Sequence, residues 1–346
     1  MISLKIEILQ ASSGDSIFLT YIGNDSTKHH ILVDGGMPNT FNKSIKKLIQ
    51  DIDCIDYIFL THIDRDHIGG ILKLLGSSHK DKIKNIFFNS GNIIKVQDSI
   101  LISENDGKEL VKYINESDRI KTNKEEITVK TKFDFYGLKI SFLSPTYEAL
   151  KHFNKNYYIG EVKEKSLISD TTKEQNNETL KKLSKIQFIE KSLKNDSANG
   201  VSLAMFLEHS NKKIILLGDA KDSVLIETLE KLGFKNQIGK RLKVDYLKLS
   251  HHGSKYHSSN QFLSLIDCQH FIISTNGSSN SRHPNIEVIA RILCHPNRDI
   301  NQKNYFYFNY PKEEYVKNNI QLLTLDEEKQ YNCESIYNKT SFEIEG

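Results

Sequence analysis

Short apolar runs alternate with amphipathic stretches along most of this chain. Runs rich in Ile, Leu, Val and Phe favour a pleated, buried surface and predict strands at 1–8, 30–33, 55–60, 213–217, 244–249 and 271–274. Apolar residues at helical spacing predict helices around 41–50, 221–232 and 285–294. Strands separated by helices indicate a layered α/β fold.

Residues capable of chemistry follow several of these predicted strands directly. They are Asp34, His62, Asp219, His251 with His252, and Asn276. Loops beyond strand ends converge while the sheet holds them rigid, so the sites of layered α/β proteins gather there. The repeated placement predicts one shared site.

Two segments differ from the rest in composition. Residues 92–132 and 146–198 are rich in Lys, Glu, Asn and Ser, with few apolar positions. We expect them to be insertions on a single domain that spans 1–346, forming a lid or a surface for a protein partner. Solvated helices and loops are the alternative. Within the second segment, residues 174–194 have helical spacing at Leu180, Leu183, Ile186, Ile189 and Leu193.

Overall composition restricts the protein class only weakly. The 47 basic and 44 acidic residues leave a net charge of +3, which by itself favours neither a nucleic acid nor a membrane partner. The 4 cysteines lie far apart in the sequence, without the paired spacing of a zinc knuckle. No apolar run approaches the ~18 residues needed to cross a bilayer, and the first residues alternate like a strand. We therefore expect a cytoplasmic protein with free thiols and no membrane segment.

The segment 62–67 is the most specific local motif. His62, Asp64, Asp66 and His67 crowd into a turn between a predicted strand and a helix that begins near a Gly-Gly pair. Imidazole and carboxylate ligands together suit zinc or manganese, and their alternate spacing disfavours a merely solvated turn. Asp219 follows an apolar strand and a glycine, where an unpaired carboxylate would be costly, so we expect a metal ligand there. A helix N-cap is the alternative.

The order of these residues resembles the metallo-β-lactamase superfamily. The resemblance is carried by His62, Asp64, Asp66, His67, Asp219 and His251. It implies a four-layer αββα sandwich, with the insertions described above, and a metal site along one edge. The superfamily's usual H-x-H-x-D-H motif is present here as H-x-D-x-D-H, with Asp64 in its second histidine position.

A finer resemblance is to the hydrolase domain of the ComEC competence DNA-uptake proteins and their soluble relatives. It is carried by Ser13–Ser16, Leu32–Gly36, Asn199–Leu203, Leu216–Asp219, Leu247–Ser254, Ser274–Gly277 and Arg282–Pro284. The chain departs from that family in the length and charge of 146–198, and at 11–13, where relatives tend to have a glycine-containing turn. The membrane channel is absent, so the resemblance does not imply transport.

The resemblance implies two divalent metal ions, Zn²⁺ or Mn²⁺ with Mg²⁺ also possible, held by the six residues named above. A third histidine of the wider superfamily is missing before Asp219, where Asp196 and Asn199 stand instead. More oxygen ligands at the first metal position would shift its preference from zinc toward manganese or magnesium and weaken it. The second position would comprise Asp66 and His67 with His251. We expect His251 rather than its neighbour His252 to be the ligand.

The function predicted is hydrolysis of phosphodiesters by metal-activated water, with a nucleic acid or nucleotide as substrate and nuclease as the leading activity. Candidate catalytic residues are Asp64, Asp66, His252 and His283, and candidate contacts to phosphate are Asn199, Ser254, Lys255 and Asn276. Three alternatives stay open. The same core could hydrolyse an acyl ester or lactam, or a small cyclic nucleotide. It could also be a non-catalytic or partner-activated subunit of a multi-protein bacterial system, including a defence system.

Overall fold

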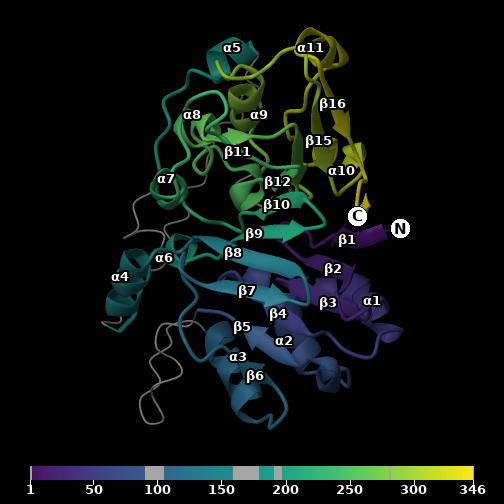
Figure 1. The fold of residues 1–346 in the computed structure, drawn as a ribbon. Helices are drawn as coiled ribbons and strands as arrows, with labels where there is room; N and C mark the ends of the chain where they lie inside the picture. Colours follow the sequence, from purple (N-terminus) through teal and green to yellow (C-terminus); the bar gives the residue numbers. More distant parts are fainter. Residues whose placement is uncertain (1, 90–104, 159–178, 191–196, 280–281, 346) are drawn as a thin grey trace.

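The computed structural model describes residues 2–89, 105–158, 179–190, 197–279 and 282–345 (Figure 1). Two mixed sheets dominate it. The first sheet has the strand order β17-β1-β2-β3-β4-β5-β6, and the second has the order β16-β15-β14-β12-β10-β9-β8-β7. The strands of the first sheet are β1 (Ile2–Ile8), β2 (Ile17–Ile22), β3 (Lys28–Val33), β4 (Tyr57–Phe59), β5 (Asn85–Phe87), β6 (Lys121–Thr122) and β17 (Ser341–Glu345).

The second sheet and the helices complete the element list. Its strands are β7 (Lys132–Phe135), β8 (Leu138–Ser144), β9 (Ala204–His209), β10 (Lys212–Leu216), β12 (Tyr246–Lys248), β14 (His270–Ile273), β15 (Asn304–Phe308) and β16 (Cys333–Ile336), while β11 (Leu242–Lys243) pairs with β13 (Ile266–Asp267). The helices are η1 (Phe41–Ile45), α1 (Lys46–Gln50), α2 (Arg65–Leu75), η2 (Lys80–Lys82), α3 (Asn105–Asn115), α4 (Tyr147–Tyr158), α5 (Leu180–Leu183), α6 (Ser197–Gly200), α7 (Asp222–Lys231), η4 (Ser250–Gly253), α8 (Asn260–Ser264), α9 (Ile286–Leu293), α10 (Lys312–Lys317) and α11 (Leu325–Gln330). The predicted strands and the helices predicted around 41–50, 221–232 and 285–294 are confirmed.

Three apolar clusters define four layers. One cluster lies between the sheets and joins residues such as Leu4 of β1 to Ile214 of β10. A second packs the first sheet against α1, α2 and α3, and a third packs the second sheet against α7, α8 and α9. Within β10, Ile214 belongs to the inner cluster and Ile215 to the outer one, as the period of two of a strand requires. The αββα fold class predicted from the sequence is confirmed.

Parallel pairing brings the functional loops to one edge. β3 pairs in parallel with β4, and β12 pairs in parallel with both β10 and β14. The carboxyl ends of these strands therefore align within each sheet. The loops that follow these strands carry Asp34, His62, Asp219, His251 and Asn276. The alignment of the strand ends within each sheet agrees with the expectation of one shared edge.

Two polar segments differ from their predicted form. Residues 105–132 provide α3, which packs on α2 through buried Leu110, and β6, which extends the first sheet beside β5. They are thus built into the first half of the sandwich, while 92–104 lies outside the described residues. In 179–190 the helix covers only Leu180–Leu183, and Ile186 and Ile189 are exposed rather than part of an apolar helix face. Leu193 lies outside the described residues.

Glycines allow the turn after β3 to lie directly against α2. A Cβ on Gly70 would lie 2.0 Å from the carbonyl oxygen of Gly35, and a Cβ on Gly35 would lie 2.4 Å from the backbone nitrogen of Ile71. Neither backbone can yield without moving α2, whose first turn carries His67. Close backbone approach is therefore the reason for this glycine pair.

We predict that Gly70→Ala lowers the free energy of unfolding by about 1–3 kcal/mol, because the added methyl group overpacks a backbone contact. Urea denaturation measures the loss. Gly76→Ala at the end of the same helix is the control, since its Cβ would lie 2.8 Å from the Tyr113 hydroxyl, the tip of a flexible side chain, and no closer than 3.5 Å to any backbone atom that its neighbours contribute. Equal losses in the two variants would contradict the explanation.

A buried carboxylate links α7 to α8. Asp222 accepts a hydrogen bond of 2.9 Å from the backbone N–H of Ser259, the N-cap of α8. Burial raises the pKa of Asp222 from 3.8 to about 6, although its hydrogen bonds with Ser259 act in the opposite direction. Between these values the folded chain binds more protons than the unfolded chain. Stability from this group is therefore present below about pH 4 and is lost as the pH rises through about 6.

Asp222→Asn keeps an oxygen for the Ser259 N–H and removes the buried charge. We predict that it stabilises the chain at pH 8 by about 2–3 kcal/mol relative to wild type, and much less at pH 4. Chemical denaturation of both proteins at the two pH values gives the comparison. A difference that does not change with pH would show that ionisation of Asp222 is not responsible.

Candidate metal centre

The segments that follow three strands, β4, β10 and β12, deliver a buried group of imidazoles and a carboxylate. His62 follows β4, and His67 lies in the first turn of α2. Asp219 lies in the loop after β10, and His252 lies in η4 just after β12. All four are nearly inaccessible to solvent. Burial of so many ionisable groups is costly unless they bind one another or a metal ion.

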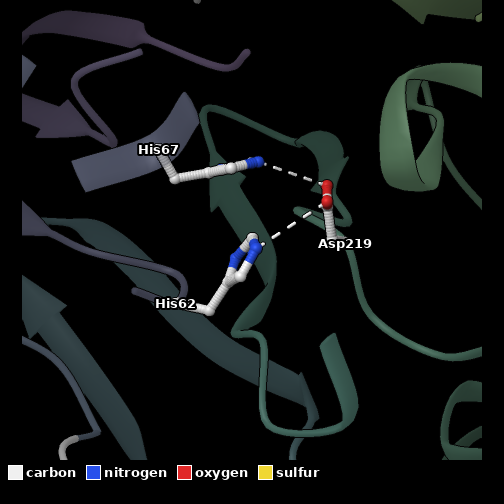
Figure 2. A group of neighbouring side chains, drawn as sticks. All are labelled: His62, His67 and Asp219. Atoms are coloured by element: carbon white, nitrogen blue, oxygen red, sulfur yellow. Dashed lines mark ion pairs between the residues drawn. The ribbon is translucent and has the colours of Figure 1, made fainter. Parts of the chain in front are cut away.

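Asp219 lies at the centre of this group, and each of its oxygens faces two imidazoles. Figure 2 shows one imidazole for each oxygen: His67 Nε2 lies 3.5 Å from Oδ1, and His62 Nε2 lies 3.7 Å from Oδ2. The second imidazole at each oxygen comes from the other half of the sandwich, with His252 Nε2 at 3.9 Å from Oδ1 and His251 Nδ1 at 3.6 Å from Oδ2. Metal–ligand bonds of ~2.0–2.2 Å place two ligands of one ion roughly 3–4 Å apart. The separations therefore suit ligands that share ions through Asp219.

Hydrogen bonds at Nδ1 fix the orientation of three imidazoles, so that Nε2 of each ring faces Asp219. These imidazoles are His62, His67 and His252. Asp34 Oδ2 accepts hydrogen bonds of 2.7 Å from His67 Nδ1 and from Thr61 Oγ1, and this Thr61 oxygen lies 3.0 Å from His62 Nδ1. His252 Nδ1 donates to the carbonyl oxygen of Ser274 at 2.9 Å. With Nδ1 protonated, the Nε2 lone pair of each ring is left for a metal.

Buried atoms without hydrogen bonds test whether a metal fits. Nε2 of His62, His67 and His252 and Oδ1 of Asp219 are buried and make no hydrogen bond. Buried polar atoms in native proteins are nearly always hydrogen-bonded, so four such atoms facing one another indicate a missing common partner. Their chemistry, imidazole nitrogen and carboxylate oxygen, is that of ligands to Zn²⁺ or Mn²⁺. The residues fit divalent metal ions.

The two motif aspartates lie on different sides of the centre. Asp66, about one-third exposed, has Oδ2 at 3.6 Å from His252 Nε2 and forms a compact cluster with His67 and His252. Asp64 precedes α2 as its N-cap residue, and its Oδ2 lies 3.8 Å from His62 Nε2. The structure thus separates a pair that the sequence placed only two residues apart.

The geometry differs from the sequence prediction in the tandem histidines. Asp66 and His67 cluster with His252, whereas the prediction grouped them with His251. With its Nδ1 held by Ser274 and its Nε2 facing Asp66, His252 is placed as a ligand rather than as a group that reaches substrate. The N-cap alternative for Asp219 is wrong, because Lys221 occupies that position at α7.

Charges within the cluster compensate one another. Burial opposes ionisation of Asp219, but His251, His67 and His252 hold its pKa well below the ordinary value of 3.8. Burial lowers the pKa of His252, but the carboxylates of Asp15 and Asp219 raise it to about 9. At neutral pH and without cations, His252 is therefore protonated, and an ion that binds there must displace the proton.

A buried ion pair behind His252 was missed at the sequence level. Lys248 Nζ donates to Asp15 Oδ2 and, at 3.2 Å, to the carbonyl oxygen of Gly218. Asp15 Oδ1 lies 3.3 Å from His252 Nδ1. The pair thus links the loop before β2 to β12 and to the loop that carries Asp219. Two signals could have revealed it: the Ser13–Ser16 motif, and a lysine within an apolar strand.

The other candidate residues divide into two groups. His283 and Asn199 come to the centre: the His283 ring lies 5.2 Å from that of His251, and Asn199 Nδ2 lies 3.2 Å from His251 Nδ1. His257, which carried no motif signal, also reaches His251 Nδ1 at 3.2 Å. Asp196 lies outside the described residues.

Contacts of the remaining candidates lie within their own loops or on neighbouring elements. Lys255 Nζ lies 3.6 Å from Glu287, Ser254 Oγ accepts from the Tyr256 N–H at 3.4 Å, and Asn276 Oδ1 accepts from the Ser278 hydroxyl at 2.6 Å. Their role in holding phosphate stays a prediction.

Residues 13–85 match the model of the Metallo-beta-lactamase superfamily. This segment contains Asp15, Asp34 and the whole 62–67 motif, so the superfamily resemblance covers the first half of the candidate centre. No curated protein matches the chain. The finer resemblance to ComEC proteins stays a prediction.

Solved structures similar to the chain include three of low sequence identity. The metallo-beta-lactamase fold protein YhfI from Bacillus subtilis has 11% identity, 100% coverage of both chains and a TM-score of 0.42. A diphosphatase of the PhnP family has 11% identity, covers 99% of this chain and 98% of its own, and has a TM-score of 0.43. Zn²⁺-bound PqqB from Methylobacterium extorquens has 11% identity, covers 98% of this chain and 100% of its own, and has a TM-score of 0.44. Among the described residues, no helix is long and apolar enough to cross a membrane.

We predict that Asp34→Asn weakens metal binding by about 10–100-fold, because an amide nitrogen would replace the oxygen that accepts from His67 and Thr61. Titration calorimetry with Zn²⁺ or Mn²⁺ measures the affinity. Asp56→Asn is the matched control, since Asp56 is also buried and binds the backbone of His30, away from the centre. Unchanged affinity in Asp34→Asn would show that its hydrogen bonds do not prepare the ligands.

Proposed function

We propose that this chain is a metal-dependent hydrolase of phosphodiesters, with nuclease as the leading activity. The observation that carries the proposal is Asp219, whose two oxygens each face a separate pair of imidazoles. Such a carboxylate suits a pair of divalent ions, which would supply an activated water at neutral pH and neutralise charge on phosphoryl oxygens. Zn²⁺ and Mn²⁺ match the donor set, with Mg²⁺ also possible.

The chain's own residues suggest how a substrate would be handled. Asp66 is the ligand candidate with a partly exposed carboxylate, so it is placed to orient a water that enters from solvent. Asp64, which is almost buried beside His62, serves better as a ligand than as a proton carrier. Both aspartates thus belong to the proposed site, and Asp66 is the one that contacts solvent and orients the water.

His283 is the remaining candidate for proton handling. Asn285 Oδ1 accepts a hydrogen bond from the backbone N–H of Lys255 at 2.9 Å and lies 3.2 Å from His283 Nδ1. This oxygen can only accept, so Nδ1 carries the proton and Nε2 keeps its lone pair. Burial holds the pKa of His283 well below its ordinary value, and the neighbouring His251 and His252 lower it further. A neutral His283 would accept a proton, or a hydrogen bond from water, rather than donate one to a leaving group.

The substrate class is part of the proposal. A nucleic acid or nucleotide fits a centre whose cations would neutralise charge on phosphoryl oxygens, and an acyl ester is the alternative substrate. A protein partner at 146–198 and a cytoplasmic location are likewise proposals.

Cleavage assays test the function directly. We expect metal-stripped protein refilled with Mn²⁺, Mg²⁺ or Zn²⁺ to cut end-labelled DNA or RNA or bis-p-nitrophenyl phosphate, and Asp66→Ala to lose about 10²-fold or more of that activity. Asp106→Ala is the control, since it removes a carboxylate that pairs with Arg65 on the surface of the same region.

Cleavage of the small diester without polymer cleavage would replace the nuclease by a small-nucleotide enzyme. No phosphodiester cleavage by the metal-loaded protein would contradict the proposal and favour an acyl substrate or a partner-activated subunit.

A further inference from the structure

The backbone at the tandem histidines is unusual. His251 (φ 47, ψ 50), His252 (φ 57, ψ 22) and Gly253 (φ 85) are consecutive left-handed residues. Residues with a Cβ rarely adopt this conformation, and such strain concentrates at functional sites. The turn is anchored at Asp219's own loop, because the His251 N–H donates to the carbonyl oxygen of Gly218 at 2.9 Å.

This turn sends the two imidazoles to different oxygens of Asp219. His251 Nδ1 lies 3.6 Å from Oδ2, whereas His252 Nε2 lies 3.9 Å from Oδ1 and 3.6 Å from Asp66. The two rings are 5.8 Å apart and nearly perpendicular, at 83°. Because their nitrogens face different oxygens of Asp219, the two imidazoles are placed on different sides of that carboxylate.

The oxygen that His251 faces is also the one that faces His62. Asn199 is buried on that side, and its Nδ2 lies 3.2 Å from His251 Nδ1. His257 Nε2 lies at the same distance of 3.2 Å from this nitrogen. An amide nitrogen is only a donor, so Nδ1 of His251 accepts this hydrogen bond through its lone pair. An ion beside Asp219 Oδ2, which lies 3.6 Å from Nδ1, would take that lone pair in place of the amide.

We propose that His251 binds the first metal ion through Nδ1 on the Oδ2 side of Asp219, while His252 binds the second on the Oδ1 side. The first ion then has His62, Asp64, His251 and Asp219, and the second has His67, Asp66, His252 and Asp219. Each set contains two imidazoles and two carboxylates. The first position is therefore not the weaker, oxygen-rich site expected from the motif, and both positions take the same kind of ion with similar affinity.

The inference rests on the metal centre of the proposed function and deepens it, but its test reads metal content rather than cleavage. The variants are His251→Asn and His252→Asn, because asparagine tolerates a left-handed backbone and is too short to replace the imidazole. After dialysis against Mn²⁺ or Zn²⁺, elemental analysis counts the ions per chain. We expect two in wild type and one in each variant, with circular dichroism showing that the fold is retained.

Double variants identify which ion is lost. Adding Asp64→Asn to His251→Asn removes a second ligand of the same ion, so one ion remains. Adding Asp66→Asn instead disables the other position, so both ions are lost. The reverse pattern would place His251 at the second position and overturn the proposal. Two ions in His251→Asn would overturn it as well.

Two further variants separate ligation from general disturbance. His283→Asn alters a neighbouring imidazole outside the proposed ligand sets, and we expect it to keep both ions. Asn199→His in the His251→Asn background offers an imidazole from a neighbouring segment, and we expect it to restore binding of the first ion, giving two ions per chain. Wild type that binds two ions but cuts no phosphodiester would contradict the proposed function and leave the ligand assignment standing. Wild type that binds none would overturn both.

Discussion

Asp219 is a carboxylate buried among four imidazoles, and the positions of the surrounding loops follow from the need to compensate its charge. Asp219 is almost inaccessible to solvent, and an ionised group there must be compensated. The compensation comes from both halves of the sandwich: His62 and His67 from the first, His251 and His252 from the second. Neither sheet holds the full set. The site is complete only because the two sheets pack face to face with these strand ends at the same edge.

Supporting carboxylates then fix the imidazoles from outside. Asp34 receives hydrogen bonds from His67 directly and from His62 through Thr61. Asp15 stands behind His252, and Lys248 offsets its charge while also holding the loop of Asp219. A site whose ligands are already oriented loses less conformational freedom when ions bind. Orienting the imidazoles is therefore the reason why these supporting polar residues are buried at one edge.

Patterns within short stretches of sequence predicted the strands, the helices and the 62–67 motif. Apolar spacing predicted most strands and helices. The motif 62–67 predicted metal ligands, because strand, turn and helix follow one another there within a few residues. The Asp15–Lys248 pair joins residues 233 positions apart, and no periodicity reports such a contact. The roles of His251 and His252 depend on left-handed dihedral angles that adjacent identical residues do not reveal.

The polar segments show a second limit of sequence patterns. α3 needs few apolar residues to pack on α2, so a lysine- and glutamate-rich segment still forms part of the first layer. Around Leu180 and Leu183 the apolar spacing continues beyond the point where the helix ends, so periodicity overestimated its length. Short helices are determined by tertiary packing more than by their own sequence.

The central claim is that Asp219 bridges two ions, and electron paramagnetic resonance of the Mn²⁺-loaded wild-type chain tests it most directly. Two Mn²⁺ ions joined by one carboxylate are close enough to couple magnetically. The account predicts the spectrum of a spin-coupled pair at two ions per chain. Signals of isolated Mn²⁺ ions at that same stoichiometry would contradict it.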